Sequence, residues 1–515
     1  KDDLLSAPTA ELLGSLGDEE VVRPLVDLLN EPGAQTIVLS QSLMALRNRY
    51  ADLYDEGKHI ADLAARYMNA TGTRNLLDAL PHARDEEMRP LITVLGWLEG
   101  PAVEQALTRL LGHPEARTEV VEALIRHGGR VTTLLTAQLQ SEDLEIRYAA
   151  AIALGRIGDA RAVPALIQAL EKDPELVIVV AGALAKIGDP RAYEALLGMM
   201  GHKKAAVRQS VISALNSLGH PRMADDMERL LTHTDPAVRE SAVKISGYFG
   251  FSQCIPKLLD RAEEKDENVR RCAIEHLPYL EEDAADARVI HALQNDTPRV
   301  RAAAAKAMAH LESRKARGPL LAALDDPDPW VRYFAARAIS KHGYTGIRDR
   351  VQAMAASDPA PQVRIESIKA MGLLDGELAV PALASFAKDE DSDVATAAVR
   401  ALGVIGPPHA LPALLQILHA GKPSLKMAVV HALGESSTGE TAEMLQWLAA
   451  SENDEAVVAA AADELALMST PESIGALVNL SADPTRRDKV VSALSGLPER
   501  DVPLLGAHLS HPQWQ

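Results

Sequence analysis

Two short groups of residues have the types and spacing that could bind a phosphate or a metal ion. Gly155, Gly158 and Asp159 lie in the stretch LGRIGDARAVPALIQAL, where two glycines near a helix start could cradle a phosphate. His431 and Glu435 are spaced i, i+4, so a helix would present both on one face as a pair of metal ligands. The elements that position these residues decide whether either chemistry is available.

An apolar position that recurs along the chain shows that the glycine pair belongs to a repeat. Apart from one interval of 52 residues, successive copies are 29 to 32 residues apart. Related glycine turns follow about half of the copies, so we expect these glycines to end helices rather than to bind phosphate. The recurring positions are Leu13, Leu43, Leu95, Leu124, Leu154, Leu184, Leu215, Ser246, Leu277, Met308, Ile339, Met371, Leu402, Leu433, Leu465 and Leu494.

Each copy predicts a helical hairpin of about 31 residues. An apolar residue followed by arginine precedes the recurring position, and an aspartate three residues earlier is typical of a helix N-cap. A later proline begins the second helix, because the first helical turn does not need its N–H. The chain is therefore expected to be all-α, with about 16 hairpins. Examples of the three signals are Val207-Arg208, Val300-Arg301 and Val363-Arg364, then Asp143, Asp328 and Asp454, then Pro164, Pro319 and Pro412.

Segments such as GDARAVPALIQAL and DPAVRESAV resemble HEAT-like repeats of the short kind that also occurs in phycobilin lyases, over about nine-tenths of the chain. The resemblance implies a right-handed α-solenoid whose Val-Arg helices line the concave surface. Tetratricopeptide and ankyrin repeats have other periods, and their motifs are missing. The resemblance also implies a structural ladder of hydrogen bonds between successive units, made by Arg208, Arg239, Arg270, Arg301, Arg332, Asp235 and Asp266.

The repeat divides the chain into three parts. Residues 1–46 hold N-terminal repeats, starting at residues 2–5 (DDLL) as a second helix without its first. Residues 47–72 are an insertion, and residues 73–515 form a continuous array that ends within a repeat at residues 512–514 (PQW). Solenoids normally end in polar caps, and neither end shows one, so we expect the chain to be a fragment of a longer protein.

The insertion contains three of the nine tyrosines, Tyr50, Tyr54 and Tyr67. Insertions in repeat arrays often protrude and bind partners, which makes these tyrosines candidate binding residues. The alternative is a degenerate unit with one lengthened helix and a spare amphipathic helix over residues 60–68. Both interpretations are open at this stage.

A row of basic residues is expected opposite the core stripe of the first helices. Near it lie Trp330, Tyr333 and Phe334, and aromatics flanked by arginine are typical of an interface hot spot. We expect this ridge to bind an acidic peptide or helix, the alternative being a solvated face on which cations happen to recur. From the sixth unit on, the row reads Lys244, Glu275, Lys306, Arg337, Lys369, Arg400 and His431.

Bulk properties narrow the function further. The net charge of -19 disfavours nucleic acid as a partner. It therefore also argues against a function as a HEAT-like DNA glycosylase. No apolar run is long enough for membrane insertion within this segment. The two cysteines, Cys254 and Cys272, are expected to be buried thiols, which favours a reducing, cytoplasmic location.

Enzymatic interpretations find little support in the motifs. Deoxyhypusine hydroxylase, a HEAT-like enzyme, binds iron through His-Glu dipeptides, and none of the 16 histidines here precedes a glutamate. We therefore expect no metal and no cofactor, and His431 with Glu435 to be surface residues. The chain is predicted to be a non-catalytic scaffold for protein partners. The alternative is a HEAT-like lyase or a chromophore-handling or cofactor-handling subunit, for which only the neighbourhood of Trp330, Phe334 and Arg337 offers a cradle.

Overall fold

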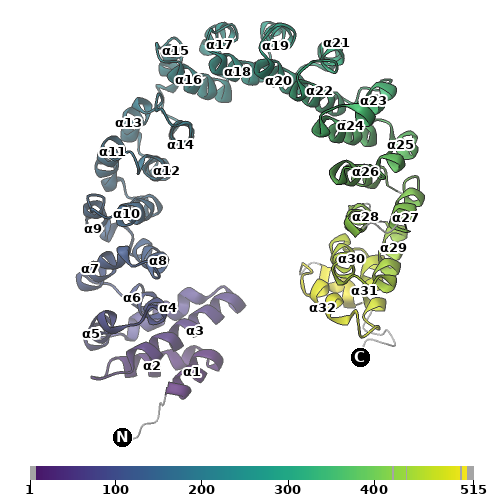
Figure 1. The fold of residues 1–515 in the computed structure, drawn as a ribbon. Coiled ribbons are helices and arrows are strands. Elements are labelled where there is room, and N and C mark those ends of the chain that lie inside the picture. Colours follow the sequence, from purple (N-terminus) through teal and green to yellow (C-terminus); the bar gives the residue numbers. More distant parts are fainter. Residues whose placement is uncertain (1–6, 407, 420–422, 436–437, 499–500, 507–515) are drawn as a thin grey trace. The chain divides into compact units, whose positions relative to one another are not determined.

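The computed structural model describes every residue except the terminal segments and four short internal gaps. Every regular element in this part of the chain is helical (Figure 1). The chain divides into two compact units, unit 1 over residues 1–254 and unit 2 over residues 255–515. Residues 2–5 and 512–514, where the repeat was expected to start and stop, lie outside the described residues. The described ranges are 7–406, 408–419, 423–435, 438–498 and 501–506.

Unit 1 consists of two rows of helices, because the first helices of successive hairpins pack on one another and the second helices follow them. The first row comprises α1 (Ala7–Leu16), α3 (Thr36–Tyr54), α6 (Asp85–Leu95), α8 (Arg117–His127), α10 (Leu144–Ile157), α12 (Val177–Ile187), α14 (Ala205–Leu218) and α16 (Pro236–Phe249). The second row comprises α2 (Val22–Leu29), α5 (Ala70–Ala79), α7 (Pro101–Arg109), α9 (Thr132–Gln138), α11 (Val163–Lys172), α13 (Tyr193–Gly198) and α15 (Met223–Leu230).

Unit 2 repeats the two-row arrangement. The first row comprises α18 (Glu267–His276), α20 (Pro298–Ala307), α22 (Pro329–His342), α24 (Pro361–Leu374), α26 (Ser392–Ile405), α28 (Pro423–Glu435), α30 (Glu455–Met468) and α32 (Arg487–Ser495). The second row comprises α17 (Ile255–Arg261), α19 (Asp283–Asn295), α21 (Ser313–Ala323), α23 (Arg348–Ser357), α25 (Val380–Phe386), α27 (Leu411–His419), α29 (Gly439–Ser451), α31 (Pro471–Leu480) and α33 (Val502–Gly506). Alanine, leucine and valine form its core, so adjacent helices approach closely.

The glycine segment of the fifth first-row helix joins two layers. Gly158 has φ of 74° and ends α10 in the left-handed conformation, which glycine adopts without strain. Gly155 lies against Ala183 of α12, where a Cβ on the glycine would stand 2.7 Å from the Ala183 Cα. The Asp159 carboxylate accepts a hydrogen bond from the Arg161 N–H and caps the short 3-10 turn that follows. The glycines therefore end a helix and permit close packing.

The insertion adds helix rather than loop. The first-row helix α3 is lengthened to 19 residues, and an extra helix, α4 (Gly57–Tyr67), follows it. α4 buries Ile60, Ala61 and Ala64, and it packs against α3 and α2. Unit 1 therefore contains one irregular layer, in which three helices take the place of two.

Arginines of the first-row helices reach forward to an aspartate at the end of the second helix of the same hairpin. The Nε and Nη2 of Arg332 each donate a hydrogen bond of 2.8 Å to the Asp358 carboxylate, while its Nη1 donates to the carbonyls of Asp326 and Pro327. The Arg332 side chain is 12% exposed and that of Asp358 6%. The same pairing joins Arg147 to Asp173, Arg270 to Asp296, Arg301 to Asp326 and Arg364 to Asp389.

The two aspartates expected in the ladder, Asp235 and Asp266, instead cap their own helices. The Asp235 carboxylate accepts from the N–H of Ala237, and Asp266 accepts from two N–H groups at the start of α18. The carboxylate of an N-cap already accepts hydrogen bonds from its own helix. The arginine of the preceding first-row helix therefore pairs with a different acid, in the connection between the two hairpins. Arg208 pairs with Glu240 at 3.1 Å, and Arg239 donates to carbonyls of the preceding turn.

Candidate functional site

The expected basic ridge is carried mainly by unit 2. One exposed residue lies on each of five successive first-row helices, which pack side by side from α20 to α28. We use the name ridge for these five residues: Lys306 on α20, Arg337 on α22, Lys369 on α24, Arg400 on α26 and His431 on α28. The structure thus presents the cations in a row, one to a layer.

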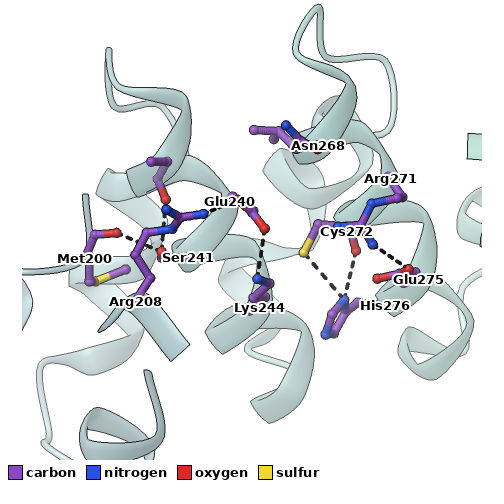
Figure 2. A network of polar contacts seen from close by, with 12 residues as sticks. Met200, Arg208, Glu240, Ser241, Lys244, Asn268, Arg271, Cys272, Glu275 and His276 are labelled. Atoms are coloured by element: carbon purple, nitrogen blue, oxygen red, sulfur yellow. Dashed lines mark hydrogen bonds and ion pairs between the residues drawn. The ribbon is translucent and has the colours of Figure 1, made fainter. Parts of the chain in front are cut away.

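Lys244, the remaining cation of the expected row, lies in unit 1 on α16 and is engaged locally. Its Nζ lies 2.8 Å from Glu240 Oε1, and the other oxygen of that carboxylate pairs with Arg208 (Figure 2). In unit 2, Glu275 is paired with Arg271 of the same helix at 2.7 Å (Figure 2). These positions therefore belong to local networks rather than to the ridge.

The ridge cations differ in how far they are neutralised. Lys369 lies 3.6 Å from Glu366, and His431 Nδ1 lies 2.6 Å from the Glu464 carboxylate. Lys306, Arg337 and Arg400 form no ion pair within the part of the chain that the structure describes. These last three supply positive charge that the protein itself does not neutralise.

An aromatic cluster adjoins the ridge at the start of α22. The Trp330 ring centroid lies 5.5 Å from that of Tyr333 and 6.1 Å from that of Phe334, and the last two rings are 5.1 Å apart. Trp330 is 51% exposed, although a side chain of its size is usually more deeply buried. The cluster therefore offers apolar contact area beside the cations.

A cavity of about 400 Å³ connects the aromatic cluster with the ridge. Its walls combine cations with apolar side chains and contain a single carboxylate, Glu366. Burial lowers the pKa of His310 in the wall, and the charge of Lys341 lowers it further, so this imidazole is neutral at pH 7. The lining residues used below are Lys306, Arg337, Lys341, Phe334, Leu373 and Glu366.

Sequence reasoning missed two of these lining residues. Lys341 follows Arg337 by four positions, so the two side chains share one helix face. This spacing could have identified Lys341, but the comparison of equivalent repeat positions does not. Leu373 is 63% exposed and reaches the cavity from α24, so only the packing of α22 on α24 identifies it. Both residues extend the candidate site, which sequence analysis had placed at Arg337 and Phe334.

The insertion tyrosines are not one cluster. Tyr50 and Tyr54 on α3 have ring centroids 5.4 Å apart, and the Tyr50 hydroxyl accepts a hydrogen bond from the Glu19 N–H. Tyr67 lies at the end of α4 beneath the guanidinium of Arg23, 5.6 Å from its ring centroid. Tyr54 alone is strongly exposed. The three side chains are therefore divided between two places.

Neither a metal site nor a membrane-spanning helix occurs in the described part of the chain. The described residues hold no group of three or more histidine, cysteine, aspartate or glutamate side chains arranged for a metal ion. Among the described helices, none combines the length and apolar character that a bilayer crossing demands. Cys254 and Cys272 are both buried.

The repeat pattern matches a known family. The sequence model described as HEAT repeats matches six segments, at residues 112–179, 171–234, 227–301, 286–356, 348–433 and 411–495. The chain belongs to the HEAT-repeat family. The arginine ladder and the glycine joints are thus features of a HEAT-repeat α-solenoid. No protein with a curated description matches the sequence.

One solved structure supports the same fold for this HEAT-repeat chain, and two others are similar to it at lower scores. It aligns with a chain of the "Kap95:Nup1 complex" at a TM-score of 0.55 and 12% identity, covering 95% of this chain and 84% of that one. A Kap95p structure with RanGDP aligns at a TM-score of 0.49 and 12% identity, covering 95% and 84%. An importin beta structure aligns at 0.45 and 12%, covering 96% and 88%. At these identities the likeness concerns the fold.

Proposed function

We propose that this HEAT-repeat protein is a non-catalytic scaffold that binds protein partners through the ridge of unit 2. The observation that carries the proposal is the cavity beside the ridge, where Lys306, Arg337 and Lys341 share a wall with Phe334 and Leu373. The family's architecture would make this face the concave one. Two buried thiols favour a reducing compartment such as the cytoplasm as its place of work.

The chemistry of the ridge selects an acidic segment with an apolar anchor. A protein of net charge -19 that keeps unneutralised cations in one row attracts complementary carboxylates and repels them elsewhere. The aromatic rings beside the cations supply contact area of the kind that dominates interface energies. An acidic helix or tail would therefore lay its carboxylates along the ridge and insert an apolar side chain into the cavity.

Presentation rather than catalysis is the mechanism that this arrangement supports. Each layer of a solenoid contacts only its neighbours, so small changes between layers let the ridge adapt to the length of a bound segment. A lyase or chromophore carrier would have to use the same cavity. Absorbance spectroscopy of the purified chain after incubation with a bilin would separate the two functions, since a scaffold acquires no visible band.

Charge reversal tests the proposal. The double variant Lys306→Glu, Arg337→Glu should bind a labelled acidic, leucine-containing helical peptide at least about tenfold more weakly, because two charge-assisted contacts become repulsive. Fluorescence anisotropy at low and high salt measures the affinity. Binding by the unaltered protein should weaken with salt, because the ridge is exposed.

The matched control reverses two exposed cations associated with the second row. Arg314→Glu, Lys388→Glu changes the net charge by the same amount away from the ridge. The control should retain affinity within about twofold. Equal weakening in both variants would show that net charge alone drives the binding and would refute the ridge as its site.

A further inference from the structure

A second cavity, of about 390 Å³, lies in the irregular layer of unit 1. It is bounded by α3, the start of α4, the turn after α6 and the end of α8. Its volume falls within the range of about 300–1,000 Å³ typical of small-ligand pockets. The insertion creates this cavity, because α4 forms one of its walls.

The wall has a surplus of two positive charges, from four cations and two carboxylates. Arg130 is neutralised by Glu99 at 2.8 Å. Arg47, Lys58 and Arg126, in contrast, form no ion pair with any described residue. The Nη1 of Arg47 donates only to the amide oxygen of Asn48 next to it, at 3.0 Å. The remaining carboxylate of the wall is Asp62.

The positive charges are close enough to affect one another. The packed helices partly shield the Arg126 guanidinium from water and thereby lower its pKa. The charge of Arg47 lowers the pKa further, whereas the charges of Asp62 and Glu122 raise it. Arg126 remains exposed on the cavity wall and available to a ligand. An anion between the two guanidiniums would relieve this repulsion.

Other polar groups around the cavity also lack partners. Trp97 is 6% exposed and its Nε1 is buried without a hydrogen-bond partner in the described part of the chain. His127 is 4% exposed, and its Nδ1 lies 3.6 Å from the Glu104 Oε1, beyond hydrogen-bond distance. Burial is the largest cause of its lowered pKa, so the ring is neutral at pH 7 and can donate one N–H. Buried polar groups are normally satisfied, so the unpartnered Trp97 N–H is an exception in the wall of this cavity.

The first turn of α4 contributes the positive end of a helix. No side chain caps this helix, and Gly57 and Lys58 in its first turn line the cavity. Gly57 packs so closely that a Cβ there would lie 3.3 Å from the Arg47 Nε. Uncapped N–H groups beside a guanidinium are a favourable setting for an anion.

We propose that this cavity binds a small molecule carrying a phosphate monoester. At pH 7 such a group has a charge of about -1.5 to -2, which matches the surplus on the wall. Two guanidiniums supply the forked donors that suit phosphate oxygens, and the Trp97 ring offers an apolar wall to the organic part. The cavity is partly open, and its volume of about 390 Å³ suits a small ligand better than a peptide or a membrane surface.

The cations do not merely neutralise the end of α8. Arg126 and Arg130 stand near the C-terminus of that helix, where positive charge complements the helix dipole. Arg47 and Lys58 belong to α3 and α4, so the dipole of α8 does not account for them. Their convergence on one cavity is what points to a ligand.

Isothermal titration calorimetry with phenyl phosphate tests the site. The unaltered protein should bind phenyl phosphate saturably and phenyl sulfate, a monoanion of similar shape, at least about tenfold more weakly. Arg47→Gln and Arg126→Gln should each weaken phenyl phosphate binding by about tenfold or more, because each removes charge-assisted donors. Arg109→Gln, which alters an exposed arginine of α7 outside the cavity, should leave it unchanged.

Integrity and alternative ligands are checked in the same proteins. Retained binding of the acidic peptide at the ridge and an unchanged circular dichroism spectrum show that each variant is folded. The proposal fails if phenyl phosphate does not bind, if phenyl sulfate binds equally, or if Arg126→Gln binds as tightly as the unaltered protein. It also fails if only a phosphoserine peptide or phosphoinositide vesicles bind through these arginines.

Discussion

The cavity beside the ridge and the cavity of the irregular layer have nearly equal volumes, about 400 and 390 Å³, and differ in how their charges are assembled. Lys306 and Arg337 occupy equivalent positions on α20 and α22, so the row of charge continues along α24 and α26. Arg47, Lys58 and Arg126 come from three unlike helices and converge on one point. Regular repetition builds a surface for an extended partner, whereas an interruption builds a site for a compact one.

The largest change in stability is expected from a substitution that breaks an arginine–aspartate pair of the regular array. Arg332→Met leaves the buried Asp358 carboxylate without its partner, which should lower the free energy of unfolding by about 3–5 kcal/mol. Denaturant unfolding measures the loss. Acidic-peptide binding at the ridge should weaken with it, while phenyl phosphate binding in unit 1 persists. Arg299→Met is the control, because its pair with Glu267 is exposed and is worth less than about 1 kcal/mol.

A pair of glycine substitutions sharpens the contrast at the irregular layer. A Cβ at Gly57 would lie 2.8 Å from the Ala51 Cβ and 3.0 Å from the Arg47 carbonyl, so Gly57→Ala should cost about 1–3 kcal/mol and weaken phenyl phosphate binding. Gly182 in the regular helix α12 has open space at its Cβ position. Gly182→Ala should therefore stabilise by about 0.5–1 kcal/mol. Thermal unfolding of both variants measures the two changes in stability. If both variants were stabilised, or both destabilised, the packing argument would be contradicted.

The smallest expected effect is the loss of stability of the folded protein at acidic pH. Burial raises the pKa of Asp326, but the hydrogen bonds from Arg301 and the Asp328 N–H, together with the Arg301 charge, outweigh it and hold the pKa below its usual value. For Asp296 the same contributions to the pKa come from Arg270 and the Thr297 N–H. A carboxylate with a lowered native pKa stabilises fully above its ordinary pKa of about 3.9, and this contribution is lost as pH falls through the native value. The free energy of unfolding should therefore decline from about pH 5 downward, and less steeply in Arg301→Met. An equal slope in that variant would exclude the pair as the cause.

The repeat was predictable because its signals are local. Gly158 ends α10, and the N-cap Asp143 begins it, each through contacts within a few residues. The resemblance to HEAT-like repeats implied the ladder with Asp235 and Asp266 as its acids. In the structure these two aspartates cap helices, and the arginines pair with acids such as Asp326 and Asp358 at the ends of the second helices.

The cavity of unit 1 could not be predicted in the same way. Its cations lie on helices α3, α4 and α8, as far apart in the sequence as Arg47 and Arg126, and no spacing rule links them. The tyrosines of the insertion were the visible signal there, yet the structure divides them between two places and brings charged residues together instead. Irregular layers are therefore the places where sequence patterns are least informative about function.

The forward direction of the arginine pairs has a consequence for synthesis on the ribosome. Arg147, Arg270 and Arg332 each find their aspartate 26 residues further along the chain, never behind them. The guanidinium of a newly made layer therefore stays unneutralised until the second helix of the same layer, which the aspartate ends, has left the exit tunnel. Nascent chains stalled so that Asp358 lies just inside or just outside the exit tunnel should differ in protease resistance at α22, because Asp358 can pair with Arg332 only in the longer chain.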